Sequence, residues 1–442
     1  MANVRPFRGL RYNPDLTNDF SSVITPPYDV INSDQQESYY KRNPHNIIRL
    51  EFGKELHQDN VQTNKYSRAA QTLNEWLQKG ILIQEERPAF YLTEHLYPHQ
   101  NGHQSYWGLV ASVRIEDFET GKIRPTEIIM KGPATDRLNL LRACQANLSP
   151  IMCVYSQSEG TLLSLFPDVD MKNPSISGTD DFDVTFNVWV INNEETVNRI
   201  SGFFADRPLY IADGHHRYTT ALAYRDERIT ESSSPSNESA YNFIMMTLIS
   251  SEDTGLALLP THRLVKNVDP ELIAQLKERL KEHFHIQKFS PPSFNPSDNL
   301  SSWRKTLNEA GEKGIAIGLY GLEGASYLLL TPHDPTSLLD LLPVEKPTAW
   351  KELDVSLLHG IILQGMLRID NPEQEKECLE YFSDETEILQ RIDAGTAQLG
   401  LLLNPVPVSS VIAVAEADVR MPPKSTYFYP KTAAGLVINP LF

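Results

Sequence analysis

Apolar and polar residues along this chain alternate between a pattern typical of buried strands and one typical of amphipathic helices. Residues 209–212 form a short apolar run, and Tyr218, Ala221, Leu222 and Arg225 then recur at the spacing of one helix face. Because strands alternate with helices along the whole sequence, we expect an α/β protein with a mixed sheet. The pattern predicts further strands at 47–53, 89–92, 106–115 (with a hairpin turn at 100–102), 151–155, 242–249, 256–259, 315–319, 327–330 and 398–403, and further helices at 67–79, 135–144, 271–283, 355–362 and 411–417.

Polar stretches that contain proline divide the chain. The segment 231–239 is rich in Ser, Asn and Glu around Pro235, which is typical of a loop or a domain boundary. A chain of 442 residues is too long for one ordinary core. We therefore expect an α/β domain at 1–235, an inserted α/β subdomain at 240–345 that is a candidate lid, and a segment at 346–442 that packs back on the first domain.

Composition narrows the classes of partner. The formal net charge of −17 argues against binding along nucleic acid or an anionic membrane, because such surfaces are held chiefly by basic patches. No apolar run has the length of a membrane span, and the first residues lack the apolar core of a signal peptide, so we expect a cytoplasmic protein. The three cysteines are too few and too scattered for a disulfide framework or a thiolate metal site.

The strongest candidate for chemistry is the turn between the apolar run and the helix. Asp213 is expected to cap the helix, and Gly214 lets the backbone turn sharply. The first-turn amides and the positive end of the helix dipole bind phosphate, and Arg217 lies one turn further on. His215 and His216 point in different directions and do not form a zinc motif. A structural interpretation remains open, in which the Asp only caps and the imidazoles bond the backbone.

Asp213 to Arg217 resembles the Asp-Gly-His-His-Arg box of free serine kinases, which belong to the ParB/sulfiredoxin-like fold and imply a nucleotide-phosphate site. A longer set of motifs is similar to the widespread microbial domain-of-unknown-function family 1015. These motifs are residues 25–31, 43–50, 132–133, 136–138, 146–151, 212–218, 259–263, 404–405 and 421–431. Thr126 replaces a His that this family usually carries before Glu127, and Asn187 replaces another, so no imidazole acts at those places.

Positive charge is concentrated in two stretches of this acidic chain. Residues 419–442 contain Arg420, Lys424 and Lys431 but no acid, and residues 122–142 contain Arg137 among five basic side chains. Such islands suit a small anionic ligand, although a charged stretch is more often a solvated face.

Residues 424–426, within the basic stretch 419–442, resemble the end of a Walker A motif. Lys424, Ser425 and Thr426 lack the glycines that a P-loop needs, so we exclude a P-loop. They and Lys431 can still donate to phosphate oxygens, or else form a surface strand.

A second His-Arg pair follows Thr261. If the inserted subdomain folds over the first domain, His262 and Arg263 would close on the ligand and exclude water. The alternative is a capped helix start or a salt-bridged loop.

These parts fit phosphoryl transfer, which needs charge neutralisation, Mg²⁺ and a carboxylate near the attacking hydroxyl. We assign Arg217 and the turn amides to phosphate, Asp213 to Mg²⁺ or the hydroxyl, and His215 or His216 to charge stabilisation or proton transfer. Glu51 is the candidate base. The hypothesis is phosphorylation of a small hydroxylated metabolite such as free serine by ATP or ADP. Alternatives are a phosphoserine phosphatase, a nucleotide-binding switch without turnover, and an interaction protein with a decayed site.

Overall fold

The computed structural model describes residues 2–17, 19–99, 102–128, 134–157, 161–290 and 296–442. The chain folds as two compact units. Unit 1 comprises residues 1–125, 129–257 and 428–442, and unit 2 comprises 126–128 and 258–427. Residues 100–101 of the predicted hairpin turn and the motif at 132–133 lie outside the described residues.

The described part of unit 1 is built on a nine-stranded sheet. The strand order is β6-β11-β8-β12-β5-β4-β10-β9, and β1 also pairs with β5. The pairs β6/β11 and β8/β12 are parallel and the others are antiparallel, so the predicted mixed α/β class is confirmed. The bounds are β1 Val4–Arg5, β4 Phe90–His99, β5 Gly102–Arg114, β6 Ile123–Pro125, β8 Ile151–Tyr155, β9 Ile176–Thr179, β10 Thr185–Ile191, β11 Leu209–Asp213 and β12 Phe243–Ser250.

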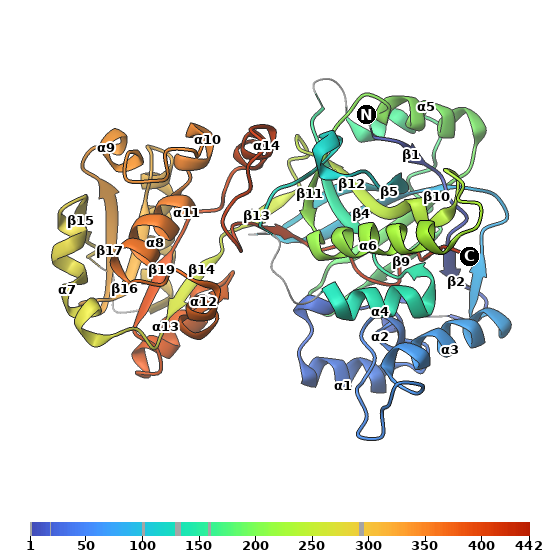
Figure 1. Ribbon diagram of the computed structural model, residues 1–442, viewed down its shortest axis with the longest axis horizontal. Helices are drawn as coiled ribbons and strands as arrows, with labels where there is room; N and C mark the ends of the chain where they lie inside the picture. The colour runs from blue at the N-terminus through green and yellow to red at the C-terminus, as the bar shows by residue number, and fades with distance from the viewer. Residues whose placement is uncertain (1, 18, 100–101, 129–133, 158–160, 291–295) are drawn as a thin grey trace. The chain divides into compact units, whose positions relative to one another are not determined.

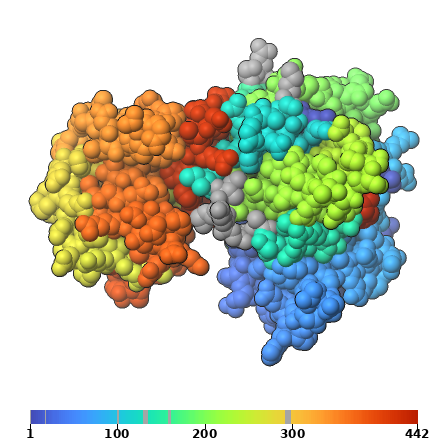
Figure 2. All heavy atoms as spheres, in the orientation of Figure 1, coloured from blue at the N-terminus to red at the C-terminus, as the bar shows by residue number. Residues whose placement is uncertain are grey.

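Helices cover this sheet and bury its apolar residues. Helix α6 runs across one face of the sheet, α4 packs beside it, and α3 packs on α4 (Figure 1). The space-filling view shows α6 in the middle of this face of unit 1, with α4 below it (Figure 2). Tyr218 and Ala221 of α6 join the strands in the core, as their helical spacing predicts. The bounds are α1 Ser33–Arg42, α2 Ile48–Glu51, α3 Lys65–Gln78, α4 Ala134–Cys144, α5 Glu194–Phe204 and α6 His215–Glu231.

The described part of unit 2 holds a six-stranded antiparallel sheet in the order β15-β17-β16-β19-β14-β18. Its strands are β14 His262–Val265, β15 Phe284–Lys288, β16 Ile317–Gly321, β17 Gly324–Pro332, β18 Leu379–Phe382 and β19 Leu399–Leu402. Its helices are α7 Pro270–Lys281, α8 Pro296–Gly311, α9 Pro335–Leu339, α10 Thr348–Lys351, α11 Asp354–Leu357, the π-helix η6 Leu358–Met366, α12 Pro372–Cys378, α13 Glu385–Asp393 and α14 Val408–Glu416. Trp303, Ile388 and Leu402 form part of its core.

Short elements complete the chain. They are β2 Leu10–Tyr12, β3 Leu82–Gln84, β7 Ala146–Asn147, β13 Ala257–Leu259, β20 Tyr427–Tyr429 and β21 Asn439–Pro440, with 3₁₀ turns η1 Phe20–Ser22, η2 Tyr28–Val30, η3 Phe118–Thr120, η4 Leu162–Leu165 and η5 Ala240–Asn242. Within the described ranges, none of the helices combines the length and the apolar character that a bilayer crossing requires.

The division into units differs from the predicted segments 1–235, 240–345 and 346–442. Strand β12 completes the sheet of unit 1, which moves the boundary from 235–240 to 257. Strands β18 and β19 pair with β14 in unit 2, and only 428–442 of the C-terminal segment belongs to unit 1.

The predicted strand at 47–53 is wrong, because this segment forms helix α2. Asn46 fixes the turn: its Oδ1 accepts from the backbone of Ile48 at 2.9 Å, and its amide donates to the carbonyls of Ser22 and Ile24. Ile47, Ile48 and Leu50 are fully buried all round the turn, so their apolar run carries no period that separates a strand from a helix.

Candidate functional site

The turn between β11 and α6 is closed by glycine. Gly214 is the N-cap residue of α6 with φ of 95°, a left-handed conformation that glycine adopts without strain. A Cβ at this position would lie 3.0 Å from Nε and from Nη2 of Arg217. Glycine is therefore required here both by the backbone and by the side chain above it.

Asp213 ends β11 and does not cap α6, so the predicted capping role is wrong. Its Oδ2 accepts from Arg217 Nη2 at 2.7 Å, and its Oδ1 lies 2.9 Å from Lys431 Nζ. Lys431 also contacts Asp29 Oδ2 at 2.9 Å. Burial alone would raise the pKa of Asp213, but Lys431, Arg217 and His215 outweigh it and hold that pKa well below its usual range. The carboxylate is therefore ionised and clamped between two cations.

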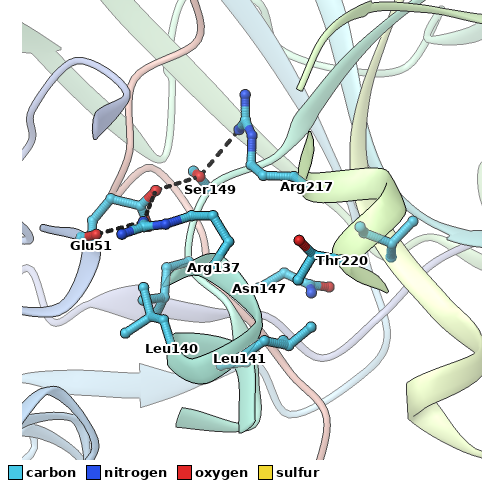
Figure 3. A pocket seen from close by; sticks show the side chains of 11 residues that line it. Glu51, Arg137, Leu140, Leu141, Asn147, Ser149, Arg217 and Thr220 are labelled. Carbon is cyan, nitrogen blue, oxygen red and sulfur yellow. Dashed lines mark hydrogen bonds and ion pairs between the residues drawn. The ribbon is translucent and has the colours of Figure 1, made fainter. Parts of the chain in front are cut away.

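The guanidinium of Arg217 is also fixed on its other side. Its Nη1 donates to Ser149 Oγ at 3.1 Å and to the carbonyl of Pro150. Ser149 Oγ donates in turn to Glu51 Oε1 at 2.9 Å, so Arg217 and Glu51 are joined through one hydroxyl (Figure 3). The forked contact predicted for Arg217 on a phosphate is taken up here by protein oxygens.

Arg137 extends the network around Glu51. Its Nη1 donates to the Glu51 carbonyl at 2.8 Å and lies 3.7 Å from Glu51 Oε1. Its Nε donates to Asp136 Oδ2 at 2.9 Å. Burial would raise the pKa of Asp136, but Arg137 and Lys65 lower it to about 2. Arg137 Cζ also stacks 3.9 Å from the ring centroid of Tyr28, so the guanidinium is held from three sides.

A small pocket of about 50 Å³ opens beside this network. Glu51, Ser149, Arg137 and Arg217 form its polar end, and Leu140 and Leu141 of α4 form part of its apolar wall (Figure 3). The pocket has room for a hydroxymethyl-sized group or a few waters and not for a nucleotide base. The rest of the pocket wall is formed by Ala146, Asn147, Leu148, Thr220 and Ile244.

The two imidazoles occupy the first turn of α6. The carbonyl of His215 accepts from Thr219 Oγ1 at 2.8 Å, and that of His216 accepts from Thr220 Oγ1 at 2.7 Å. His215 also contributes, after Lys431 and Arg217, to the low pKa of Asp213. Among the described residues, no group of three or more His, Cys, Asp or Glu side chains is arranged to hold a metal ion.

The family model described as "Protein of unknown function (DUF1015)" matches residues 4–356. The chain belongs to this family. No curated protein is a significant match to the sequence. The solved structures that resemble it include a conserved hypothetical protein from Pyrococcus furiosus, at 11% identity with a TM-score of 0.34, covering 73% of this chain and 90% of that one. They also include a free serine kinase in complex with AMP, at 11% identity, a TM-score of 0.34 and coverages of 73% and 86%. C-terminally truncated SbnI from Staphylococcus aureus resembles it at 13% identity, a TM-score of 0.34 and coverages of 75% and 87%.

The C-terminal motif of this DUF1015 protein is split between the units. Lys431 belongs to unit 1, whereas Lys424, Ser425 and Thr426 belong to unit 2. The backbone N–H groups of Ser425 and Thr426 donate to Glu127 Oε1 at 3.0 and 2.8 Å, and Thr426 Oγ1 donates to the same oxygen at 2.8 Å. Donors that the sequence assigned to phosphate therefore hold a protein carboxylate. Burial raises the pKa of Glu127, and the bonds from Thr426 oppose that shift.

The second His-Arg pair lies in β14 of unit 2 and begins a strand, not a helix. His262 Nδ1 accepts from the backbone N–H of Leu403 at 3.1 Å. Arg263 is buried; its Nη1 donates to the carbonyl of Thr261, and its Nη2 donates to the carbonyl of Lys424 at 3.0 Å. Burial lowers the pKa of Arg263 to about 10. The closing role of this pair remains a prediction.

Sequence reasoning did not assign Asp29, Ser149, Asp136 or Lys65 to the site of this DUF1015 protein. The first three lie inside or beside motifs that carry the family resemblance, so a signal was present in the sequence. Lys65 had none: it reaches Asp136 Oδ1 at 2.7 Å only because α3 packs on α4.

Proposed function

We propose that this protein is a nucleotide-dependent phosphotransferase that phosphorylates a small hydroxylated metabolite, with free serine as the first candidate. The observation that carries the proposal is the clamped Asp213. Asp213 is an ionised carboxylate that lies between two cations at the positive end of a helix dipole. A phosphoryl group could take the place of the carboxylate as the anionic partner of both cations. The resemblance of Asp213 to Arg217 to the box of free serine kinases supports the same class.

In the proposed reaction, Arg217 and Lys431 transfer part of their hydrogen bonding from Asp213 to the oxygens of the terminal phosphate. Each cation keeps a second protein partner, Ser149 for Arg217 and Asp29 for Lys431, so its position is retained when Asp213 is released. Electrostatic stabilisation of the transferring group is the main catalytic requirement in phosphoryl transfer.

The pocket beside Glu51 fits the acceptor. Its volume of about 50 Å³ suits a hydroxymethyl group. The acceptor oxygen attacks the terminal phosphorus, the bond from phosphorus to the bridging oxygen breaks, and the hydroxyl proton passes to Glu51. The nucleotide leaves with one phosphate fewer. The Ser149 hydroxyl orients Glu51 for this step by donating to its Oε1.

A nucleotide-borne Mg²⁺ fits the donor set. Mg²⁺ in phosphate-transfer sites uses one or two protein carboxylates with phosphate oxygens and water, and Asp213 and Asp29 supply two carboxylates on either side of Lys431. When bound there, it would neutralise phosphate charge.

The test is transfer of phosphate to serine by the purified full chain. The protein is incubated with serine, Mg²⁺ and either ATP or ADP, and phosphoserine is measured by mass spectrometry. We expect Asp213→Asn, Arg217→Ala and Glu51→Gln to lose about 10²-fold or more of the rate, because each removes charge stabilisation or the base. Asp226→Asn and Arg228→Ala, at the exposed end of the same helix, are matched controls that retain it.

Two outcomes would overturn the proposal. The first is hydrolysis of phosphoserine without any transfer from nucleotide, which indicates a phosphatase. The second is thermal stabilisation by nucleotide with Mg²⁺ that is equal in the wild type, Asp213→Asn and Arg217→Ala, because the ligand would then bind elsewhere.

A further inference from the structure

Unit 2 contains a larger cavity that the proposed reaction does not use. Its volume is about 430 Å³, which is within the range of small-molecule sites. Its lining residues come from α8, the start of β14, the segment that leads into α13, and the end of β19 and the residues after it. Two motifs of the family resemblance, 259–263 and 404–405, meet at its wall.

One end of the cavity is polar. His262 and Glu385 are buried there, with Nε2 of the imidazole 3.6 Å from Oε2 of the carboxylate. Because the backbone N–H of Leu403 donates to Nδ1 of His262, that nitrogen carries a lone pair and the ring proton lies on Nε2, facing Glu385. The ring is therefore neutral in this arrangement and adds no positive charge to the cavity.

The carboxylates of this end outnumber its cations. Arg304 binds Glu385 through Nε and Nη2 and lies 3.3 Å from Asp384 Oδ1. Burial would raise the pKa of Glu385, but His262 and Arg304 lower it to about 2, so this buried carboxylate is ionised near neutral pH. One guanidinium faces two carboxylates, and one negative charge is left over.

Asp384 is the carboxylate that is open to a ligand. Its side chain is 67% exposed, and its contacts with Arg304, the Thr386 backbone and the Thr386 hydroxyl all use Oδ1. Most of the remaining lining is apolar: Leu259, Pro260, Trp303, Leu307, Leu402, Leu403 and Pro405, beside Ser383, Asn308 and Asn404. An acidic end and an apolar wall in one cavity match a molecule with a cationic head and an apolar body.

We propose that this cavity is a binding site for a small organic ammonium ion, with the cationic head at Asp384 and an apolar body along the Leu307 wall. The site lies wholly within unit 2 and is independent of the reaction proposed at Asp213.

The test uses three probes of one shape and different charge. Tyramine carries an ammonium group, 4-ethylphenol carries no charge, and 4-hydroxyphenylacetate carries a carboxylate. We expect calorimetric titration of the full chain to give the order tyramine, then 4-ethylphenol, then the acid. Asp384→Asn should weaken tyramine binding about fivefold, the contribution of a partly exposed ion pair, and leave 4-ethylphenol unchanged.

The variants are chosen so that folding does not decide the result. Asn still caps α13 as Asp384 does. Asp334→Asn is the matched control, because Asp334 caps α9 in the same way and does not line the cavity.

The proposal fails if 4-hydroxyphenylacetate binds as tightly as tyramine, if Asp384→Asn and Asp334→Asn bind tyramine equally, or if no probe binds at millimolar concentration. Transfer of phosphate to serine is unaffected by any of these results, so failure here and failure at Asp213 are distinguishable.

Discussion

Lys431 Nζ lies 2.9 Å from Asp213 Oδ1, which ties the last segment of the chain to the end of β11. The same ammonium contacts Asp29, so one cation from the C-terminal motif compensates two carboxylates from two other motifs. Burial alone would lower the pKa of Lys431, but Asp213 and Asp29 outweigh it and raise that pKa. Removing the cation would leave the mostly buried Asp213 with Arg217 as its remaining cation, and would take this partner from Asp29, which is partly exposed.

Lys431→Met should therefore destabilise unit 1 by about 2–4 kcal/mol. This is somewhat less than the roughly 3–5 kcal/mol for breaking a fully buried ion pair from one side, because Asp213 keeps Arg217 and Asp29 is partly exposed. Lys41→Met is the control, because Lys41 is exposed and forms only a surface pair with Glu37. Urea unfolding followed by hydrogen exchange of the β11 amides measures the difference. Equal unfolding midpoints for the two variants would contradict the role of Lys431.

Gly214→Ala tests the turn itself. Alanine at φ of 95° is strained, and its Cβ would lie 3.0 Å from the Arg217 guanidinium. Gly80→Ala is the matched control, since Gly80 has φ of 70° but no atom within 4 Å of a new Cβ. Both variants should lose about 1 kcal/mol through the backbone, and Gly214→Ala should lose more because Arg217 must move. Thermal unfolding of both proteins measures this excess; no excess would show that Arg217 yields freely.

The sequence was most informative where local pattern and local contact coincide. The strand at 209–212, the glycine turn and the helix that follows could be predicted, because apolar period and turn chemistry act over a few residues. The role of Asp213 could not: its partner Lys431 is remote in the chain, and the competition between capping and an ion pair is decided by tertiary structure. The helix α2 was missed for a similar reason, since the side chain of Asn46 fixes it by bonding to Ser22 and Ile24. The predicted boundary at 345–346 divides the second sheet wrongly, because β18 and β19 lie far from β14 in the sequence but pair with it.

Glu127 accepts three hydrogen bonds from the motif at 424–426. Two substitutions distinguish the effect of its negative charge from that of its acceptor oxygen. Glu127→Ala leaves three donors of Ser425 and Thr426 without this acceptor and should cost unit 2 about 1–3 kcal/mol. Glu127→Gln retains a carbonyl oxygen in place of Oε1 and removes the buried charge, so it should cost much less.

The pKa shift of Glu127 gives its contribution to stability a pH dependence of definite sign. Because the folded-state pKa of Glu127 is raised, the folded protein holds this proton more tightly than the unfolded chain, and its contribution to stability falls as pH rises above about 4.3, the unfolded value. The cost of Glu127→Gln should therefore shrink as pH rises above that value, because only the wild type loses this contribution. Urea midpoints at several pH values measure the cost, and a cost that grows as pH rises would reverse the assignment.

Asp354, at the start of α11, offers the clearest titration in unit 2. Burial raises its pKa to about 7, although the backbone N–H of Ala316 donates to it and opposes the shift. The folded protein therefore keeps a proton that the unfolded chain releases near pH 3.9, so stability falls as pH rises between about 4 and 7, by at most about 1.4 kcal/mol per pH unit. Asp354→Asn retains an acceptor for Ala316 and has no proton to release, so the difference in unfolding free energy between variant and wild type should grow through this window and level off above it. Asp340→Asn, at the exposed end of α9, is the control and should show no such growth. A difference in unfolding free energy that stays constant from pH 4 to 8 would mean that this carboxyl is ionised in the folded protein throughout. Water or another hydrogen-bond donor would then supply the solvation that burial removes from the carboxylate.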